Sequence, residues 1–332
     1  HESRRRAIAL QSPRPLTRHK DIFKSFITMD PHFLFSALAD PTRVKILLLV
    51  SDQQLSVGEL AELLDQSQPR VSRHVRILVE AGLLARQKEG AFVFVGLASG
   101  PAADVAALTQ QLAEGADLIG RERERLARVR AERQKTVDEW FRANAGEWDL
   151  LRRMGGQEAE VEQALLAAAP EPGRLLDIGT GTGRLLELLA PAAETATGID
   201  RSPEMLRLAR AKLTGEGGQC ADLRQADMHH LPFDSASFDT VTMQHVLHFA
   251  DDPAMVLREA ARVVAPGGRL LLADYEAHSH EDLRTRYRHA RLGFAADTVG
   301  SMLRAAGLSP QLLSRHPGPE LSVLVWEGLQ TR

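Results

Sequence analysis

Glycine recurs at every second position in the segment RLLDIGTGTGR, which spans residues 174–184. The apolar residues before the glycines predict a buried strand, and the run Leu185–Leu189 after them predicts a helix. Glycine adopts positive φ angles without strain and lets bare backbone approach a ligand. A strand, a glycine loop and a helix in this order are typical of doubly wound α/β sheets, which bind nucleotides at the carboxyl ends of their strands. The segment therefore predicts a Rossmann-like sheet with a ligand beside Gly179, Gly181 and Gly183.

Three acidic residues lie at the ends of predicted strands near this loop. Asp177 precedes the glycines, Asp200 ends the next apolar stretch, and Asp227 lies at a third strand end. A carboxylate in the position of Asp200 suits the two hydroxyl donors of a ribose diol. The alternative for each carboxylate taken singly is a structural cap. Residues 238–243 predict a fourth strand, and residues 266–268 predict a turn into a fifth at residues 270–272.

The series of motifs resembles that of the class I S-adenosylmethionine-dependent methyltransferases, especially the small-molecule enzymes of quinone biosynthesis, over residues 140–326. Dinucleotide oxidoreductases prefer G-x-G-x-x-G, in which the third glycine comes one residue later than it does here. The resemblance implies S-adenosylmethionine or S-adenosylhomocysteine as cofactor. It places Asp177 and the glycine loop at the amino-acid end, Asp200 at the ribose, and Asp227 with Met228 at the adenine amino group. The cofactor-binding residues that it implies are Asp177, Gly179, Thr180, Gly181, Gly183, Asp200, Arg201, Met205, Asp227, Met228 and Gln244.

Two histidines follow the predicted fourth strand, where the resembled enzymes build their acceptor pocket. Methyl transfer from a sulfonium needs mainly alignment and exclusion of water, but an oxygen or nitrogen acceptor can also need a base. His245 and His248 are the candidate catalytic residues, and the alternative is that they only line the pocket. Trp140, Phe141 and Trp148 would cover the ligand or anchor the sheet to the preceding segment.

A second arginine-rich segment follows the predicted fifth strand. Tyr275 and His278 would lie at the edge of the same pocket. Arg284, Arg288 and Arg291 could bind an acidic acceptor or effector. The alternative for these arginines is a solvated helix face.

The first hundred residues predict a different fold. Residues 33–50 indicate two helices separated at Asp40-Pro41-Thr42, residues 56–64 a short helix, and residues 68–80 a longer one that Gly82 closes. Residues 83–97 predict two strands around Glu89-Gly90. Helix, turn, helix and hairpin make a winged helix-turn-helix, and the segment 31–97 resembles the ArsR/SmtB family of bacterial repressors.

The helix predicted at 68–80 buries one face and exposes another. Val71, Val75, Leu78 and Val79 share the apolar face, whereas three arginines lie away from it and His74 lies at its margin. Arginine can reach guanine edges or phosphates in a major groove, and the hairpin can reach neighbouring phosphates. The alternative is a charged surface helix in a domain that binds only protein. The candidate DNA-binding residues are Gln68, Arg70, Ser72, Arg73, His74, Arg76, Arg86 and Lys88.

Residues 101–135 predict helix with a broken apolar stripe at Leu108, Leu112, Ile119, Leu126 and Val129. The resembled repressors pair through such a helix, so the expected assembly is a homodimer on a double-stranded DNA operator; the alternative is a solvated linker helix. The predicted organisation is a basic, disordered tail at 1–28 that precedes the native start, a winged domain at 29–100, a helical linker at 101–137 and a methyltransferase domain at 138–332.

Composition sets further limits. The formal net charge of −3 provides no general basic field, so DNA contacts must come from a local patch. The single cysteine, Cys220, excludes an intrachain disulfide and argues against arsenite methylation, and the stretch 55–60 lacks the thiolates of arsenic-sensing repressors. We therefore predict no metal. The sequence contains no membrane-spanning run and no signal-peptide core, which is consistent with a cytoplasmic protein.

Together these patterns predict a DNA-binding regulator whose second domain binds S-adenosylmethionine and methylates a small-molecule acceptor. One alternative is a sensor domain without turnover, for which the cofactor is only an effector. Another is an enzyme whose winged domain only dimerises.

Overall fold

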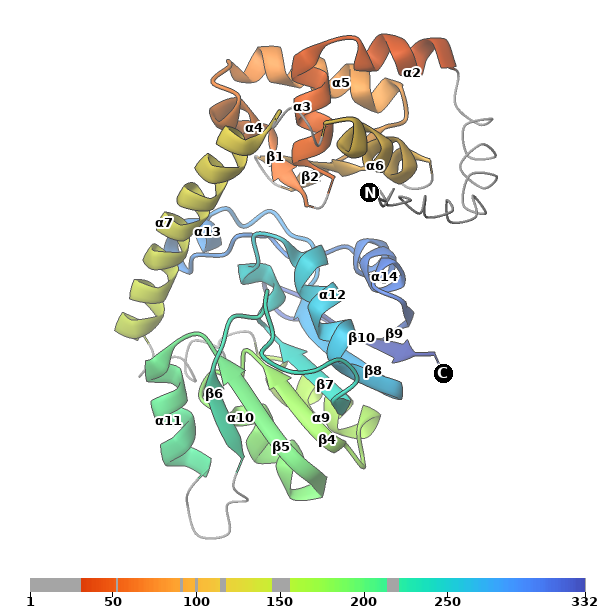
Figure 1. Cartoon of the computed structure of the whole chain (residues 1–332). Coiled ribbons are helices and arrows are strands. Elements are labelled where there is room, and N and C mark those ends of the chain that lie inside the picture. The colour runs from red at the N-terminus through yellow and green to blue at the C-terminus, as the bar shows by residue number, and fades with distance from the viewer. Residues whose placement is uncertain are drawn as a thin grey trace, which may run out of the picture.

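The computed structural model describes residues 31–51, 53–89, 92–98, 101–113, 118–144, 156–213 and 221–331. An N-terminal winged unit and a C-terminal sheet unit are connected by a long helix (Figure 1). The basic segment 1–28, Trp148 and Cys220 lie outside the described residues.

The winged unit has the helix and strand pattern expected from the sequence. Its elements are α2 (Pro31–Leu38), α3 (Pro41–Leu49), β1 (Leu55–Ser56), α4 (Val57–Leu63), α5 (Gln68–Glu80), β2 (Leu84–Glu89) and β3 (Phe92–Leu97), with the strands in the order β1-β3-β2. Helix α3 begins where predicted because the Asp40 carboxylate accepts hydrogen bonds from the Thr42 and Arg43 amides. A capping box between Ser56 and Glu59 starts α4. Gly82, with φ of 72°, lets the chain leave α5 in the left-handed conformation.

The linker consists of α6 (Ala102–Ala113) and α7 (Gly120–Asn144). Its apolar stripe divides between two environments. Ile119 and Leu126 are buried in the core of the winged unit, whereas Leu108 and Leu112 are 45% and 79% exposed. Helix α7 continues past the domain boundary expected at residue 137, because neither glycine nor proline interrupts residues 138–144. Trp140 and Phe141, which were expected to cover the ligand or anchor the sheet, therefore lie in the last turns of the linker helix.

The C-terminal unit is a seven-stranded sheet in the order β6-β5-β4-β7-β8-β10-β9, which confirms the predicted doubly wound fold. The strands from β6 to β8 are parallel, and β10 runs antiparallel to both of its neighbours. Its strands are β4 (Gly173–Ile178), β5 (Ala193–Asp200), β6 (Asp222–Gln225), β7 (Phe238–Gln244), β8 (Val264–Tyr275), β9 (Leu308–His316) and β10 (Val323–Gln330). The helices among them are α9 (Glu158–Ala168), α10 (Arg184–Leu189), α11 (Pro203–Leu213), α12 (Pro253–Val263), α13 (Asp282–Arg286) and α14 (Ala296–Ala305), with short 3-10 turns η2 (Ala190–Ala192) and η3 (Leu247–Phe249).

One predicted turn is wrong. Residues 266–268 lie inside β8 as an irregularity, because the pairing with β7 shifts between Phe238 opposite Val264 and Thr240 opposite Arg269. The positive φ of Gly267 is accommodated in that shift. The strand therefore begins earlier than the pattern predicts.

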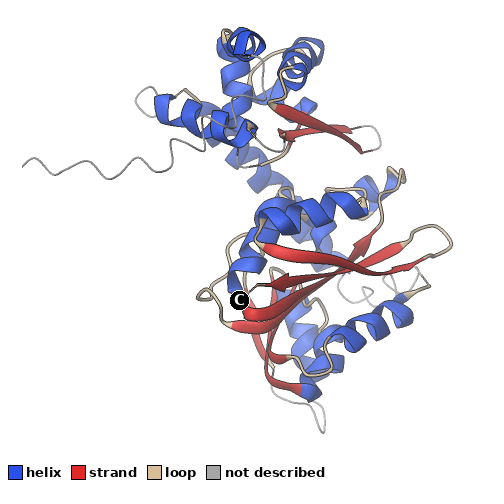
Figure 2. Ribbon diagram, turned by 90° about the vertical axis from the view of Figure 1, so that its right-hand side faces the viewer, coloured by secondary structure: helices blue, strands red, loops and turns tan. Residues whose placement is uncertain are grey.

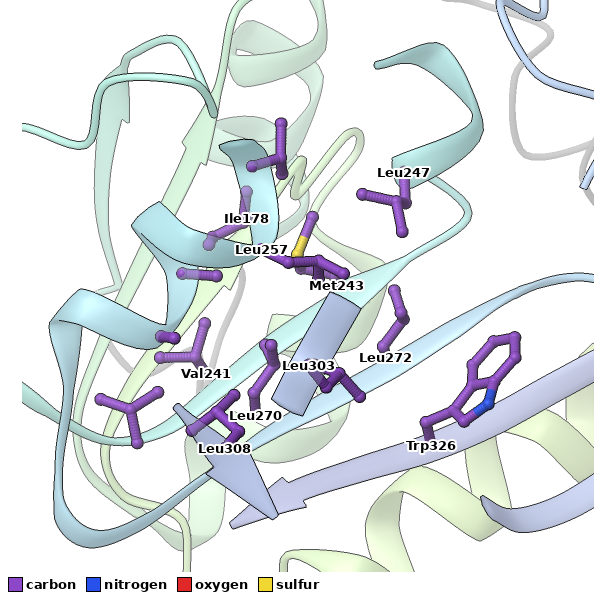
Figure 3. Packing of buried hydrophobic residues seen from close by; sticks show 14 of the residues in the cluster. Ile178, Val241, Met243, Leu247, Leu257, Leu270, Leu272, Leu303, Leu308 and Trp326 are labelled. Carbon is purple, nitrogen blue, oxygen red and sulfur yellow. The ribbon is translucent and has the colours of Figure 1, made fainter. Parts of the chain in front are cut away.

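The sheet is buried on both faces, with helices on each side (Figure 2). Consecutive residues of the central strands separate into two cores, as the alternation of side chains in a strand requires. Leu176, Leu270 and Leu272 pack with residues of α12 and α14 on one face (Figure 3), whereas Leu175 and Leu271 pack with α9 and α10 on the other.

The strand order reverses at β4, which has β5 on one side and β7 on the other. Such a switch point leaves a crevice at the carboxyl ends of the strands, where doubly wound sheets bind ligands.

Candidate cofactor pocket and DNA-binding face

The glycine loop follows β4 and enters this crevice. Gly179, Gly181 and Gly183 all have positive φ, at 71°, 55° and 80°. A Cβ on Gly179 would lie 2.4 Å from Cγ2 of Val246, so only glycine fits there. The loop is held in place by the Thr180 amide, which donates to the Ile199 carbonyl at 2.8 Å. The backbone is therefore bare where a ligand would approach.

The Asp200 carboxylate lies against this loop at the end of β5. One oxygen accepts from the Gly181 amide at 2.9 Å, and the other accepts from the Ser202 amide at 2.8 Å. Burial raises the pKa of Asp200 to about 6, although the two backbone donors favour the ionised form. The fixed carboxylate has lone pairs left for the hydroxyls of a ribose.

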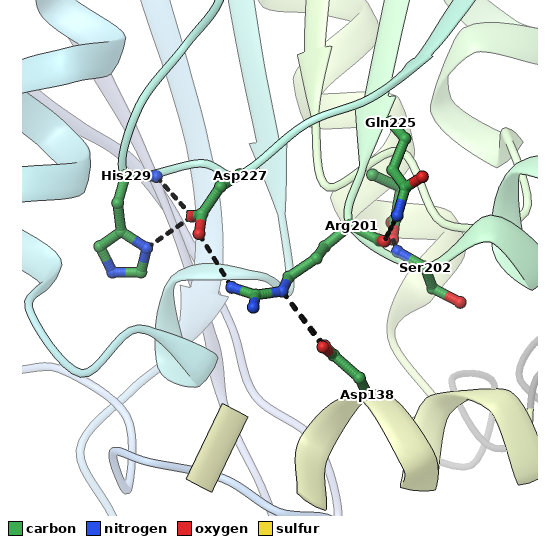
Figure 4. A network of polar contacts seen from close by, with 7 residues as sticks. Asp138, Arg201, Ser202, Gln225, Asp227 and His229 are labelled. Carbon is green, nitrogen blue, oxygen red and sulfur yellow. Dashed lines mark hydrogen bonds and ion pairs between the residues drawn. The ribbon is translucent and has the colours of Figure 1, made fainter. Parts of the chain in front are cut away.

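The Asp227 carboxylate lies in a polar network just beyond the end of β6 (Figure 4). One oxygen accepts from the His229 amide at 2.9 Å and lies 2.8 Å from His229 Nδ1, whereas the other accepts from the Arg201 guanidinium at 2.8 Å. The hydrogen bond from His229 holds the pKa of Asp227 below its usual range, and Arg201 adds to this effect. Arg201 also contacts Asp138 of α7 at 3.3 Å.

These groups surround one pocket with about 1040 Å³ of empty space, part of which is open to solvent. It is lined by all the predicted cofactor residues except Gly183. Gly183 instead begins α10, and a Cβ there would lie 3.1 Å from Ala209 and from Leu213. The Thr180 hydroxyl oxygen is buried and has no hydrogen-bond partner among the described residues. Buried polar groups are normally hydrogen-bonded, so this hydroxyl is available to a polar ligand in the pocket.

Several lining residues were not predicted from the sequence. Ser202 and His229 lie next to predicted residues in the chain, so their proximity was a usable signal. Val137 and Asp138 come from α7, where only the aromatic residues Trp140 and Phe141 were expected near the ligand. Phe141 of the same helix also lines the pocket, and its ring packs against Phe249.

The two candidate catalytic histidines have different environments. His245 lines the cofactor pocket, is 4% exposed and has φ of 53°, a left-handed conformation that is rare for residues with a side chain. Its Nε2 lies 3.1 Å from Oε1 of Glu158, outside hydrogen-bonding alignment, and its Nδ1 has no partner in the described part of the chain. The other oxygen of Glu158 accepts a hydrogen bond from the side-chain amide of Gln244 at 3.2 Å.

His248 is not among the residues that line the pocket. Its Nδ1 lies 2.8 Å from the buried Asp274 carboxylate, and its ring packs against Phe249, Tyr275 and His289. The segment is a 3-10 turn rather than the α-helix that would have placed both histidines on one face. This enclosure favours a structural role for His248.

The expectation of a solvated helix face for the arginines after β8 is wrong at Arg291. Arg291 is only 1% exposed, and its guanidinium lies 3.7 Å from the centroid of the Phe94 ring in β3 of the winged unit. Arg284 is half-buried and lies over the Phe92 ring at 4.6 Å, whereas Arg288 is exposed. Two of these arginines thus contact the wing.

The predicted DNA-binding face is exposed on α5 and β2. Gln68, Arg70, Ser72, Arg73 and Arg76 are exposed on the helix, and Arg86 and Lys88 are exposed on the strand. His74 differs from this set. Its side chain is 12% exposed, its Nδ1 lies 3.9 Å from Asp40, and burial lowers its pKa. The cationic side chains therefore project from one element that fits a major groove and from the adjacent wing.

Strand order, glycine loop and strand-end acids define the C-terminal unit as a class I methyltransferase. Residues 176–272 match the family model described as a methyltransferase domain, and residues 40–86 match the one described as bacterial regulatory protein, arsR family. The demethylmenaquinone methyltransferase of Thermus thermophilus is 33% identical over 190 residues, which cover 54% of this chain and 86% of that protein.

The ubiquinone/menaquinone biosynthesis C-methyltransferase UbiE of Desulfotalea psychrophila is 36% identical over 145 residues, which cover 42% of this chain but only 57% of that protein. A solved DhpI–SAH complex shares the fold, with a TM-score of 0.50 and 23% identity over 59% of this chain and 96% of that one.

The chain therefore belongs to the class I S-adenosylmethionine-dependent methyltransferases and carries an ArsR-type DNA-binding domain before the methyltransferase domain. The cofactor of this family is S-adenosylmethionine, which becomes S-adenosylhomocysteine on transfer of the methyl group. None of the helices in the described residues is long and apolar enough to cross a membrane.

Proposed function

We propose that this protein is a cytoplasmic transcriptional regulator that also methylates a small molecule. Its ArsR-type domain would bind a double-stranded DNA operator as a homodimer, and its second domain would transfer the methyl group. The exposed arginines of α5 support the first activity. The single observation that carries the second is the position of His245, a buried imidazole in the cofactor pocket with one nitrogen facing a carboxylate and the other without a partner among the described residues.

In this proposal Glu158 orients His245 and His245 acts as the base. The carboxylate favours the tautomer with the proton on Nε2, which leaves Nδ1 as a proton acceptor. When bound, S-adenosylmethionine supplies an electrophilic methyl group. His245 Nδ1 takes the proton of the acceptor hydroxyl while the hydroxyl oxygen bonds to the methyl carbon. With S-adenosylhomocysteine as the leaving group, which would keep the electron pair of the carbon–sulfur bond, the products would be the methyl ether, S-adenosylhomocysteine and a protonated His245.

The acceptor that fits this pocket best is a planar hydroxylated aromatic. Phe141 and Phe249 line the pocket with their ring centroids 5.0 Å apart, and the His245 ring packs 4.7 Å from Tyr275. Flat aromatic ligands stack favourably on such surfaces. The relatives support the same class, since one is named for demethylmenaquinone and the other for ubiquinone and menaquinone biosynthesis.

Exposed apolar side chains support the homodimer. Phe33 and Phe35 of α2 are 62% and 70% exposed, and Leu112 of α6 is 79% exposed. A second chain would remove these rings and this leucine from water. Sedimentation equilibrium tests the proposal. Phe35→Ser with Leu112→Ser should shift the protein toward monomer, and a wild-type monomer at micromolar concentration would count against it.

Methyl transfer is tested by the release of S-adenosylhomocysteine in the presence of a panel of catechols and hydroquinones. His245→Phe keeps a ring against Tyr275 but removes the base, so kcat should fall by about 100-fold or more. Glu139→Gln, an exposed change on the same helix that lines the pocket, is the control, and its kcat should stay close to that of the wild-type protein. Full activity of His245→Phe would remove the proposed base.

The sensor alternative, a domain that binds the cofactor without turnover, has one observation in its favour. The helix that enters the cofactor pocket is the same helix that packs into the winged core. A chain that binds S-adenosylhomocysteine and DNA, but releases no product with any acceptor, would favour the sensor over the enzyme. An enzyme whose winged domain only dimerises would instead show turnover and bind no operator.

A further inference from the structure

Helix α7 belongs to both units of the protein. At its first turns Leu126 is buried in the winged core and Glu122 accepts from Lys45 of α3 at 2.5 Å. At its last turns Val137, Asp138 and Phe141 line the cofactor pocket. The helix rises about 1.5 Å per residue, so Glu122 and Asp138 lie roughly 24 Å apart along one rigid element. Figure 1 shows this helix extending from the winged unit to the sheet unit.

The end of α7 is attached to the groups that should hold the adenosine. Arg201 follows the ribose acid Asp200 directly in the chain, and its guanidinium contacts both Asp138 at 3.3 Å and Asp227 at 2.8 Å (Figure 4). Both Asp227 oxygens are engaged, one with His229 and one with Arg201. Because one oxygen already has two contacts with His229, we expect an adenine amino group that bonds Asp227 to share the oxygen that Arg201 uses or to displace Arg201 from it.

A second contact, besides α7, joins the two units. The Arg291 guanidinium stacks on Phe94 of the wing at 3.7 Å and lies 3.3 Å from Oε1 of Gln54. The backbone amide of Arg291 donates to the His248 carbonyl, which lies in the segment that follows β7. A shift of the α7 end must therefore be accommodated where the wing meets the sheet unit.

We propose that Asp138 is a cofactor-site residue and that, through it, occupancy of the adenosyl pocket changes the affinity of the winged unit for DNA. The inference rests on the proposed DNA binding and adds the regulation of that same site. Arg201 bridges α7 and the adenine acid, and cofactor binding alters this bridge. Because the helix is continuous, the force on Asp138 reaches the helix end packed between α3 and α4. Linkage is reciprocal, so DNA must change cofactor affinity by the same factor.

The test measures the affinity for DNA with and without the cofactor, and the affinity for the cofactor with and without DNA. A labelled duplex is recovered from a random-sequence library in parallel selections with and without S-adenosylhomocysteine. Its Kd is then measured by fluorescence anisotropy at one salt concentration with and without saturating ligand, and the Kd of S-adenosylhomocysteine is measured by calorimetry with and without the duplex. We expect each ligand to change the affinity for the other by about 5-fold or more. Changes within about 2-fold in both directions would overturn the inference.

Substitutions test whether the coupling passes through the ion pair of Asp138 and Arg201. Asp138→Asn should reduce the coupling, the ratio of each Kd with and without the other ligand, to within about 2-fold, whatever its effect on cofactor affinity alone. Arg201→Gln removes the other side of the same pair and should lose the coupling as well. Glu139→Gln changes the neighbouring carboxylate, which is exposed on α7, and should keep the full coupling. Coupling that survives both Asp138→Asn and Arg201→Gln would exclude this route. Failure of the wild-type protein to bind either ligand alone would instead count against the proposed function.

Discussion

Asp200 is the residue at which the cofactor assignment can be tested most quantitatively. Asp200→Asn keeps the shape of the side chain but replaces one oxygen by an amide donor. That donor would face the amide of Gly181 or Ser202, which now donates to the carboxylate. Hydrogen bonds to a charged group contribute about 1.5–3 kcal/mol each. Loss of the charged partner of the ribose should therefore cost about 2 kcal/mol or more, which raises the Kd for S-adenosylhomocysteine roughly 30-fold.

The pH dependence of cofactor affinity provides a second, independent test of the same assignment. Burial raises the pKa of Asp200 to about 6, and the ribose hydroxyls bind the ionised form. At pH 5 only about one molecule in ten carries that form in the free protein, so affinity should fall about 10-fold from its value at pH 8. Since the folded pKa lies above the unfolded value of 3.8, ionisation of Asp200 also lowers the free energy of unfolding as the pH rises from about 4 to 6.

Calorimetric titration with S-adenosylhomocysteine at a series of pH values measures both effects. The wild-type Kd should rise below pH 6, and the Asn variant should bind weakly with little dependence on pH. Circular dichroism at each pH confirms that both proteins remain folded. Equal affinity of the two proteins, or a wild-type Kd that is constant from pH 8 to pH 5, would refute the ribose assignment.

Three further predictions concern the loop, the DNA-binding face and a buried histidine. Gly179→Ala adds a Cβ that would lie 2.4 Å from Val246, at a residue with positive φ. The free energy of unfolding, measured by urea denaturation, should fall by about 2–4 kcal/mol. Stability equal to that of the wild-type protein would contradict this loop geometry. Arg73→Ala should raise the Kd for DNA by about 5-fold or more at fixed salt, whereas the exposed Arg207→Ala should not; equal effects would show that α5 is not the recognition helix. Burial lowers the pKa of His289, so stability should fall as the pH drops below 6.5, and His289→Phe should show a smaller loss between pH 7 and pH 5; identical slopes would contradict the buried neutral imidazole.

The sequence predicted those parts of the site that depend on local geometry. Asp177, Asp200 and Asp227 each come at or just after the carboxyl end of a parallel strand. Parallel strands place such ends along one edge of a sheet, so the three acids meet without any information about side-chain packing. The capping residue Asp40 and the closing residue Gly82 were predictable for the same reason, since each acts on the backbone of its neighbours.

Contacts between distant elements were not predictable in this way. Asp138 meets Arg201 only because α7 continues past the expected domain boundary, and its own sequence gives no sign of where that helix will end in space. Arg291 belongs to a charged run that suggests a solvated face, yet the wing of the other unit buries it beneath Phe94. The contrast between His245 and His248 depends likewise on the 3-10 turn after β7 and on Tyr275 from β8.

The most direct test of the central claim is a crystal structure of the whole chain saturated with S-adenosylhomocysteine. We predict that the ribose lies on the Asp200 carboxylate, the adenine lies beside Asp227 and Met228, and the amino-acid end lies along the glycine loop next to Asp177. Phe141 of α7 should cover the ligand. Density for the ligand anywhere else, or none in this pocket at saturating concentration, would contradict it.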